Sequence, residues 1–297
     1  MSAGASLSRE ARGLRLGLLG VCGFSLTLPM TRIAVAELDP VFAGLGRSLV
    51  SVVLALGVLA WKRDRFPGAR HLPSFLTIAL GVIVGFPLLT AFALRRVPAS
   101  HGAVVIAVLP LFTALCGTLR ARDRPSPLFW LAAFVGSATV IAFILLTGGL
   151  RPTAADLLLL AAVVTCAMGY AEGGRLSREL GSWRVLCWAL VLACPFLAVP
   201  VAVSVWEHGL HASLGAWAAF AYMGVVSMFL AFWAWYEGLS LGGVARVSQT
   251  QLLQVFLTLA AARFINGENI APSMLVAATV VVACVAVARR ARIGVAR

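Results

Sequence analysis

Long apolar segments recur along the whole chain, and they constrain its fold more than any other feature. A helix needs roughly 18 apolar residues to cross about 30 Å of hydrocarbon, because each residue advances it by about 1.5 Å. Such segments predict an all-α membrane protein with ten transmembrane helices, at residues 14–36, 41–61, 74–94, 98–119, 127–147, 155–174, 184–206, 214–236, 242–264 and 271–288.

The composition agrees with a membrane protein. Of the 297 residues, 61% are hydrophobic and only 12% are charged, whereas about a quarter of the residues in soluble domains are charged. Little sequence lies outside the ten segments, so no soluble domain remains to hold a separate activity. The cysteines lie inside predicted spans without paired spacing or nearby histidines. We expect them to be small core residues, with no metal and no cofactor.

The distribution of charge predicts the orientation of the chain. A net charge of +13 would suggest nucleic acid for a soluble chain. Here three quarters of the 24 Lys and Arg residues fall on the side of the two termini, if successive loops alternate between sides. Since loops rich in Lys and Arg stay inside, both termini are predicted to be cytoplasmic. The expected partners are a small-molecule substrate and the lipid bilayer, not nucleic acid, and the expected assembly is a monomer.

A cleaved signal peptide is the alternative for the N-terminus, since basic residues precede an apolar run. The run from Leu14 is longer than about 20 residues, which is long for a signal core. The ten-helix count also requires that this segment stays in the mature chain.

The two halves of the chain resemble each other. A shift of 145 residues aligns Phe75 with Phe220 and, in the last polar turn of each half, Pro127 with Pro272. We therefore divide the chain into five-helix repeats at 1–148 and 149–297. Because five is odd, the second repeat enters the membrane from the opposite side, and such inverted repeats are typical of secondary transporters.

Four stretches resemble a known family. They are AELDPVFAGLGRSLVSVVLAL (36–56), ALRRVPASHGAVVIAVLPLFTALCGTLRARDRPSP (93–127), YAEGGRLSRELGSWRVLCWAL (170–190) and YEGLSLGGVARVSQTQLLQVFLTLAAARFINGENIAP (236–272). The sequence resembles the EamA-type exporters of the drug/metabolite transporter superfamily, and among them the exporters of aromatic amino acids. The resemblance implies two inverted five-helix repeats around a central cavity, in the inner (cytoplasmic) membrane of a bacterium.

The predicted ninth helix carries an unusual polar face. At about 100° per residue, Gln251, Gln254 and Thr250 share an arc of about 100°, which Arg246 and Ser248 widen. An amide in hydrocarbon without a partner would cost several kcal/mol, so this face must meet protein or water. It either lines a cavity and binds substrate or bonds neighbouring helices together.

Other polar residues have two interpretations each. His101 and Ser100 either end a helix at the membrane surface or meet a substrate carboxylate, since histidine can change charge near neutral pH. Arg47, about two turns into a span, either pairs with Glu37 or Asp39 or attracts an anionic group.

A cluster near the cytoplasmic ends of the sixth and eighth helices comprises Tyr170, Glu172, Trp233 and Tyr236. Its aromatic rings are either interface anchors or substrate contacts. Glu172 either pairs with Arg175, three residues on, or holds a substrate ammonium.

Prolines inside the spans predict kinks, and Pro29, Pro87 and Pro110 are candidate hinges. Passive kinks are the alternative, because membrane helices tolerate proline.

These features together predict export of small metabolites by alternating access. Aromatic or other apolar amino acids are the first choice of substrate, and flat organic cations are the second. The alternatives are a channel or facilitator for a small polar solute and an intramembrane enzyme. For the enzyme, the spans lack HExxH, GxSxG and paired-carboxylate motifs.

Overall fold

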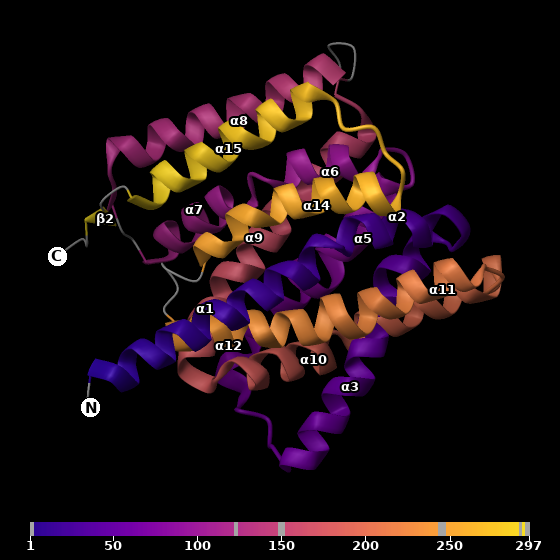
Figure 1. Cartoon of the computed structure of the whole chain (residues 1–297). Coiled ribbons are helices and arrows are strands. Elements are labelled where there is room, and N and C mark those ends of the chain that lie inside the picture. Colours follow the sequence, from indigo (N-terminus) through magenta and orange to yellow (C-terminus); the bar gives the residue numbers. More distant parts are fainter. Residues whose placement is uncertain (1–2, 122–123, 148–151, 243–247, 291–292, 295–297) are drawn as a thin grey trace.

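The computed structural model describes residues 3–121, 124–147, 152–242, 248–290 and 293–294, and these form a helical bundle (Figure 1). The first half contains α1 (Ala3–Ser25), α2 (Thr27–Glu37), π-helical η1 (Phe42–Gly46), α3 (Arg47–Lys62), 3₁₀-helical η2 (Ala69–His71), α4 (Leu72–Ile78), π-helical η3 (Ala79–Gly85), α5 (Phe86–Leu94), α6 (Ala99–Ile106), α7 (Leu109–Ala121), β1 (Arg124–Pro125) and α8 (Pro127–Thr147). The second half contains α9 (Ala154–Leu180), α10 (Ser182–His208), α11 (Leu214–Ala221), π-helical η4 (Tyr222–Ala231), α12 (Phe232–Gly242), 3₁₀-helical η5 (Ser248–Gln251), α14 (Leu252–Ile265), α15 (Pro272–Arg290) and β2 (Ile293–Gly294).

Eight helical stretches in the described residues are long and apolar enough to cross a membrane. They are Ala11–Glu37, Phe42–Lys62, Ala69–Leu94, Ala99–Gly117, Pro127–Thr147, Ala154–Leu180, Ser182–His208 and Leu214–Gly238. Two shorter apolar helices, Leu252–Ile265 and Pro272–Val287, occupy the ninth and tenth predicted segments. The chain is therefore an all-α membrane protein apart from one two-residue strand pair, and its count of ten crossings stays a prediction.

The ninth predicted helix, 242–264, begins later in the described chain. Gly242 ends α12, residues 248–251 form the 3₁₀ turn η5, and α14 begins at Leu252. The prediction is therefore wrong at residues 248–251, and residues 243–247 lie outside the described residues.

Three π-helical segments widen the helices, and serines of α3 bond two of them. Because a π-turn bonds residue i to i+5, it moves carbonyls away from their usual helical partners. Ser48 Oγ donates to the carbonyl of Ile83 in η3 at 3.1 Å, and Ser51 Oγ donates to that of Gly224 in η4 at 2.7 Å. Shifted by 145 residues, η3 falls inside η4, so the wide turn recurs at the same place in both halves.

Helices of the two halves pack in corresponding pairs. α1 packs against η4 and α12, and its counterpart α9 packs against α4, η3 and α5. Small residues permit the approach: a Cβ on Gly20 would lie 3.0 Å from Ala231 O, and one on Gly81 would lie 2.4 Å from Thr165 O. Likewise α3 packs on α10, and α14 packs on α6.

The last helices of the two halves, α8 and α15, lie side by side in opposite directions (Figure 1). β1 precedes α8 and pairs antiparallel with β2, which follows α15. Gly136 of α8 lies against Cys284 of α15, where an added Cβ would approach Cys284 Cβ to 3.3 Å. The beginning of α8 therefore lies beside the end of α15.

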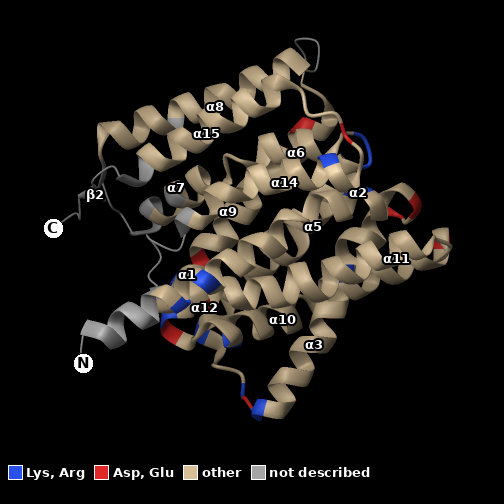
Figure 2. Cartoon of the chain, viewed as in Figure 1, with Lys and Arg blue, Asp and Glu red and all other residues tan. Residues whose placement is uncertain are grey.

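Charged residues of the described chain gather at the two ends of the bundle, and its middle is almost free of them (Figure 2). This is the distribution expected when the helices cross a hydrocarbon layer, because a charge in that layer is costly. Arg47 is an exception, since it is buried with 2% of its surface exposed.

Candidate functional site

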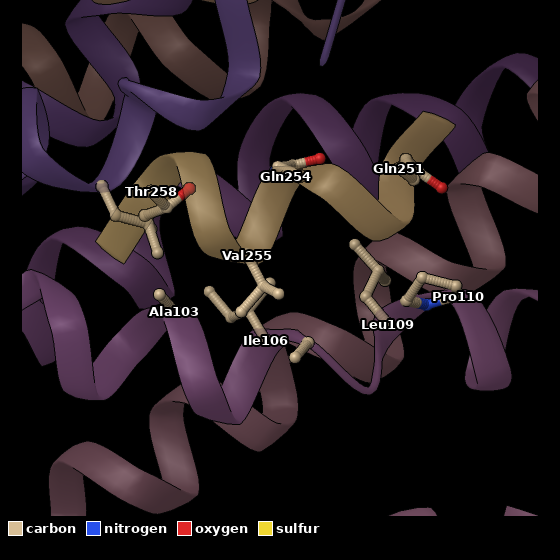
Figure 3. Close-up of a pocket in the computed structure, with 10 residues that line it drawn as sticks. Ala103, Ile106, Leu109, Pro110, Gln251, Gln254, Val255 and Thr258 are labelled. Atoms are coloured by element: carbon tan, nitrogen blue, oxygen red, sulfur yellow. The ribbon is translucent and has the colours of Figure 1, made fainter. Parts of the chain in front are cut away.

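Two adjoining pockets lie where the halves meet, and together they are called the central cavity below. Its first lobe has an empty volume of about 380 Å³ and lies between α14 and the junction of α6 with α7 (Figure 3). Its second lobe has an empty volume of about 500 Å³ and is lined from α1, α2, α3, α9, η4 and their neighbours. Both lobes are lined by helices of the two halves, and they adjoin because four residues line both, namely Leu28, Ile106, Leu109 and Gln254.

The junction of α6 and α7 is a break in the fourth predicted helix, and Pro110 explains it. Proline lacks the N–H that would bond to the carbonyl four residues earlier, and its ring crowds that carbonyl. The next N–H, of Leu111, donates to Val108 O at 3.0 Å instead of continuing the α-helical pattern to Ala107. Ile106 at the end of α6 and Ala107 in the turn that follows line the cavity at this break.

On the facing side, Gln251 at the end of η5 and Gln254 and Thr258 of α14 lie along the first lobe (Figure 3). The spacing of four residues puts Gln254 and Thr258 on one face of α14, and Gln251 directly precedes that helix. Gln254 also reaches the second lobe. The two glutamines thus lie where the sequence places them, and their role in substrate binding stays a prediction.

Of the other predicted residues of this region, the structure describes the side chain of Thr250 alone, and Thr250 is not among the lining residues of either lobe. Thr250 lies in the 3₁₀ turn η5, half-buried, so the α-helical arc drawn from the sequence does not extend to it. Ser248 begins the same turn, and Arg246 falls outside the described residues.

The second lobe is mainly apolar with a few polar groups. Thr27 of α2 and Ser227 of η4 line it and share a hydrogen bond of 2.7 Å between their hydroxyls. Tyr170 also lines it, with its ring edge-on to Phe232 at a centroid distance of 5.9 Å. Tyr170 is therefore a third predicted substrate contact that lies in the cavity, and its role likewise stays a prediction.

Arg47 lines the second lobe from the start of α3, with 2% of its surface exposed. Its Nε and Nη1 atoms are buried without a hydrogen-bond partner in the protein. Neither acid proposed from the sequence is paired with it: Glu37 accepts bonds from the backbone N and Oγ of Ser213, and Asp39 accepts one from Ser204 Oγ at 2.6 Å. A guanidinium stays charged, and burying it unpaired costs several kcal/mol.

His101 and Ser100 lie on α6 but do not line the central cavity. His101 Nε2 lies 2.6 Å from Asp156 Oδ1, and both side chains are buried. Asp156 in turn closes the capping box of α9 with Thr153. The backbone N–H of Ser100 donates to Glu268 Oε2 at 2.8 Å. The contacts of both residues in the structure are thus with protein groups.

Glu172, Trp233 and Tyr236 also lie outside the cavity lining. Arg175 Nη2 lies 2.7 Å from Glu172 Oε1, which is the local pair considered from the sequence, and it also donates to Ser74 Oγ. Tyr236 packs on Phe232 at a centroid distance of 5.8 Å, and Trp233 packs on Phe229 at 5.9 Å. Each of these ring contacts joins residues four positions apart on the continuous helical stretch of η4 and α12.

The three candidate hinge prolines each follow a change in the helix. Pro29 is the third residue of α2, just after a break at Leu26, and Pro87 is the second residue of α5, just after η3. Pro110 is the second residue of α7. By contrast, Pro195 and Pro200 lie inside α10, which is unbroken. Motion at the three positions stays a prediction.

Sequence reasoning overlooked Thr27 and Ser227, and it left the role of Arg47 open. Single small hydroxyl residues in apolar segments carry no signal, because most of them bond to their own helix. Arg47 did stand out in the sequence, since an arginine two turns inside a span requires a partner. The structure also shows, among its described residues, no group of three His, Cys, Asp or Glu side chains that could hold a metal ion.

Known proteins share sequence and fold with this chain. The model of the EamA-like transporter family matches the chain twice, over residues 11–146 and 153–290. A crystal structure of a protein shares the fold with a TM-score of 0.63 and 17% sequence identity, covering 94% of this chain and 98% of that one.

Three curated relatives carry functional names. The uncharacterized transporter YdeK of Bacillus subtilis (strain 168) is 42% identical over 285 residues, covering 96% of this chain and 99% of its own. A probable terminal-alkyne amino-acid exporter of Streptantibioticus cattleyicolor is 28% identical, covering 95% of this chain and 89% of its own. The uncharacterized inner membrane transporter YedA of Escherichia coli (strain K12) is 30% identical, covering 50% of this chain and 49% of its own.

Proposed function

We propose that this chain, which belongs to the EamA-like transporter family and is a membrane transporter of that type, exports small amphipathic metabolites. We propose further that it does so by alternating access. Aromatic and other bulky apolar amino acids are the substrates we place first. The central cavity carries this proposal, because it lies between the two halves and joins apolar walls to a few polar groups. Ligand sites of this kind suit a substrate with one apolar and one polar end.

Inverted repeats are the architecture we propose for this transport. Three observations support repeats at 1–148 and 149–297: the double family match, the recurring π-turn, and the antiparallel packing of α8 and α15. In secondary transporters, repeats of opposite orientation let one half move against the other around a fixed site. We place the chain in a bacterial inner membrane with both termini in the cytoplasm, in line with the name of one relative.

Amino acids rank first because of one relative and the shape of the cavity. The probable exporter of Streptantibioticus cattleyicolor is named for a terminal-alkyne amino acid. Phe24, Phe86 and Phe232 line the second lobe, and rings of this kind accommodate an aromatic or bulky aliphatic body. A flat organic cation ranks lower, because no Asp or Glu of the described chain lines either lobe.

Counterflow in vesicles tests the proposal. Purified protein is reconstituted, and uptake of labelled phenylalanine, threonine and a flat organic cation is measured against a gradient of unlabelled compound. We expect saturable phenylalanine uptake that unlabelled phenylalanine on the opposite side accelerates, since a carrier exchanges its substrate. Linear uptake without acceleration would indicate a channel. If none of the three compounds moves faster than in empty vesicles, the substrate class is wrong.

The double variant Gln251→Leu, Gln254→Leu tests whether transport requires the amides of the cavity lining. We expect it to abolish uptake with an unchanged melting temperature, because it removes the amides of the lining and keeps an apolar helix face. Thr279→Val is the matched control, since it removes an exposed hydroxyl of α15 that lies outside the lining. Normal uptake by the double variant would mean that the glutamines only hold helices together.

A further inference from the structure

We infer that Arg47 is the carboxylate receptor of the central cavity, so that the transporter selects organic acids and amino acids with an apolar body over neutral and cationic analogues. The inference rests on the proposed function, because it assigns the polar end of the transported molecule to one residue.

The position of Arg47 shows that its side chain is built into the cavity wall. It follows the π-helical segment η1 and begins α3, where all five residues of η1 are buried. Its own backbone is fixed, because Ser51 Oγ bonds to Arg47 O at 3.3 Å and a Cβ on Gly224 would lie 3.0 Å from the same oxygen. The guanidinium therefore has no room to reach the membrane surface by a shift of its helix.

The charge of Arg47 has no counterion in the described part of the chain. No Asp or Glu oxygen there lies within 4.0 Å of its nitrogens, and the acids closest in sequence bond to Ser213 and Ser204. Two of its nitrogens, Nε and Nη1, have no partner. A guanidinium presents N–H groups in a planar fork that matches the two oxygens of a carboxylate. A carboxylate would therefore satisfy both its charge and its donors.

The remaining lining determines what the carboxylate is attached to. Aromatic and aliphatic side chains form most of the second lobe, and its neutral polar groups include Thr27, Ser227 and Gln254. These groups can bond an amine or hydroxyl, but they do not neutralise a cation. We thus expect an apolar acid and an apolar amino acid to bind well, and their amides to bind poorly.

Paired ligands test this directly with the unaltered protein in nanodiscs. Binding of 3-phenylpropionate is compared with that of 3-phenylpropionamide, and phenylalanine with phenylalaninamide, by calorimetry. Each pair differs only in the carboxylate. We expect the acid of each pair to bind at least tenfold more tightly. Amides that bind as tightly as the acids would overturn the inference but leave the proposed transport of apolar metabolites standing. If no member of either pair binds, the proposed substrate class fails as well.

Variants of Arg47 then test whether this residue is the one that distinguishes each acid from its amide. Arg47→Gln is expected to reduce the preference for the acid to about onefold, and Arg47→Lys to retain part of it. Arg263→Gln removes the same charge from the exposed end of α14 and should keep the full preference. A preference that survives Arg47→Gln would assign the carboxylate to another group. Should Arg47→Gln not fold, Arg47→Lys and the ligand pairs still decide the question.

Chloride separates a general anion site from one for apolar acids. We expect excess chloride to leave 3-phenylpropionate bound, since it cannot use the apolar wall. Complete displacement by chloride at equal concentration would reduce the site to a general anion site and overturn the substrate assignment.

Discussion

Gly81 is a residue at which one added methyl group should separate two helices. A Cβ there would lie 2.4 Å from the backbone oxygen of Thr165 in α9, a distance that cannot be accommodated without movement. We expect Gly81→Ala to lower the free energy of unfolding by about 1–3 kcal/mol, as overpacking does in tight interiors. Thermal unfolding in detergent, followed by the melting temperature, measures this.

Gly57→Ala on α3 is the control, because a methyl group fits there without a clash. A Cβ at Gly57 meets no atom within 4 Å. Alanine is favoured over glycine inside a helix by about 0.5–1 kcal/mol, so this variant should be at least as stable as the parent chain. Equal losses of stability in the two variants would show that the contact with Thr165 is not the cause.

Individual residues of the site were predictable when they broke the apolar pattern. Gln251 and Gln254 stand out in a membrane segment, and both line the cavity. Their neighbour Thr250 was misplaced, because helical spacing was applied across a 3₁₀ turn. The partner of His101 was not predictable, since Asp156 lies 55 positions away and only the fold brings them together.

At the level of elements, Pro110 breaks the fourth helix where it crosses the central cavity. Pro110→Ala restores the missing N–H and removes the ring, a change that is worth about 3 kcal/mol in a regular helix. We expect a continuous helix, an equal or higher melting temperature and a several-fold lower turnover number, if the break must change shape during transport. Initial rates of counterflow at saturating substrate give the turnover number.

Pro195→Ala is the matched variant in α10. That helix runs from Ser182 to His208 without interruption, so removal of its proline leaves the path of the chain unchanged. We expect normal turnover. The hinge assignment of Pro110 would be untenable if both variants turned over like the parent protein.

Glu268 is predicted to stabilise α6 from the second half of the chain. Its carboxylate accepts the N–H groups of Ala99 and Ser100, both at 2.8 Å, at the start of α6. Because capping of free N–H groups contributes about 0.5–2 kcal/mol, Glu268→Ala should lower the melting temperature. Glu207→Ala, a change at an exposed carboxylate of α10, should not. Equal melting temperatures for the two variants would contradict the cap.

The helices themselves were largely predictable, and their irregular turns were not. The length of its apolar run predicted the fifth helix at residues 127–147, because a span must cross a fixed thickness of lipid. The structure has this helix at Pro127–Thr147. The π-turns η3 and η4 left no sequence signal, since they are made of the same apolar residues as the regular turns around them. Both accept hydrogen bonds from serines of α3, which only tertiary packing brings near.

At the scale of the whole molecule, the proposed opposite orientation of the halves would link the charge pattern to the cavity. The pairs α1 with α12 and α9 with α5 are related by the 145-residue shift, and residues of all four helices line the second lobe. The division into two repeats follows from the last polar turn, which recurs before Pro127 and Pro272, and it stays a prediction. The cavity residues of α1 and α2 have no distinct sequence pattern, whereas Arg47 of α3 stands out as an arginine inside a span.

Reporter fusions test the orientation and the number of crossings together. Alkaline phosphatase is active only outside the cytoplasm. A fluorescent protein, by contrast, folds poorly when it is exported unfolded, so its fluorescence marks the cytoplasmic side. We expect phosphatase activity for insertions after His211 and Asn269, and fluorescence for an insertion after Arg65 and a fusion after Arg297. If the eight long stretches all cross, this pattern requires α14 and α15 to cross as well, despite their shorter apolar lengths, and it gives ten crossings with both termini inside. Fluorescence after Asn269 would instead give eight crossings and place the polar face of α14 outside the bilayer core. That result would contradict the proposed inverted symmetry, on which the proposed alternating access depends.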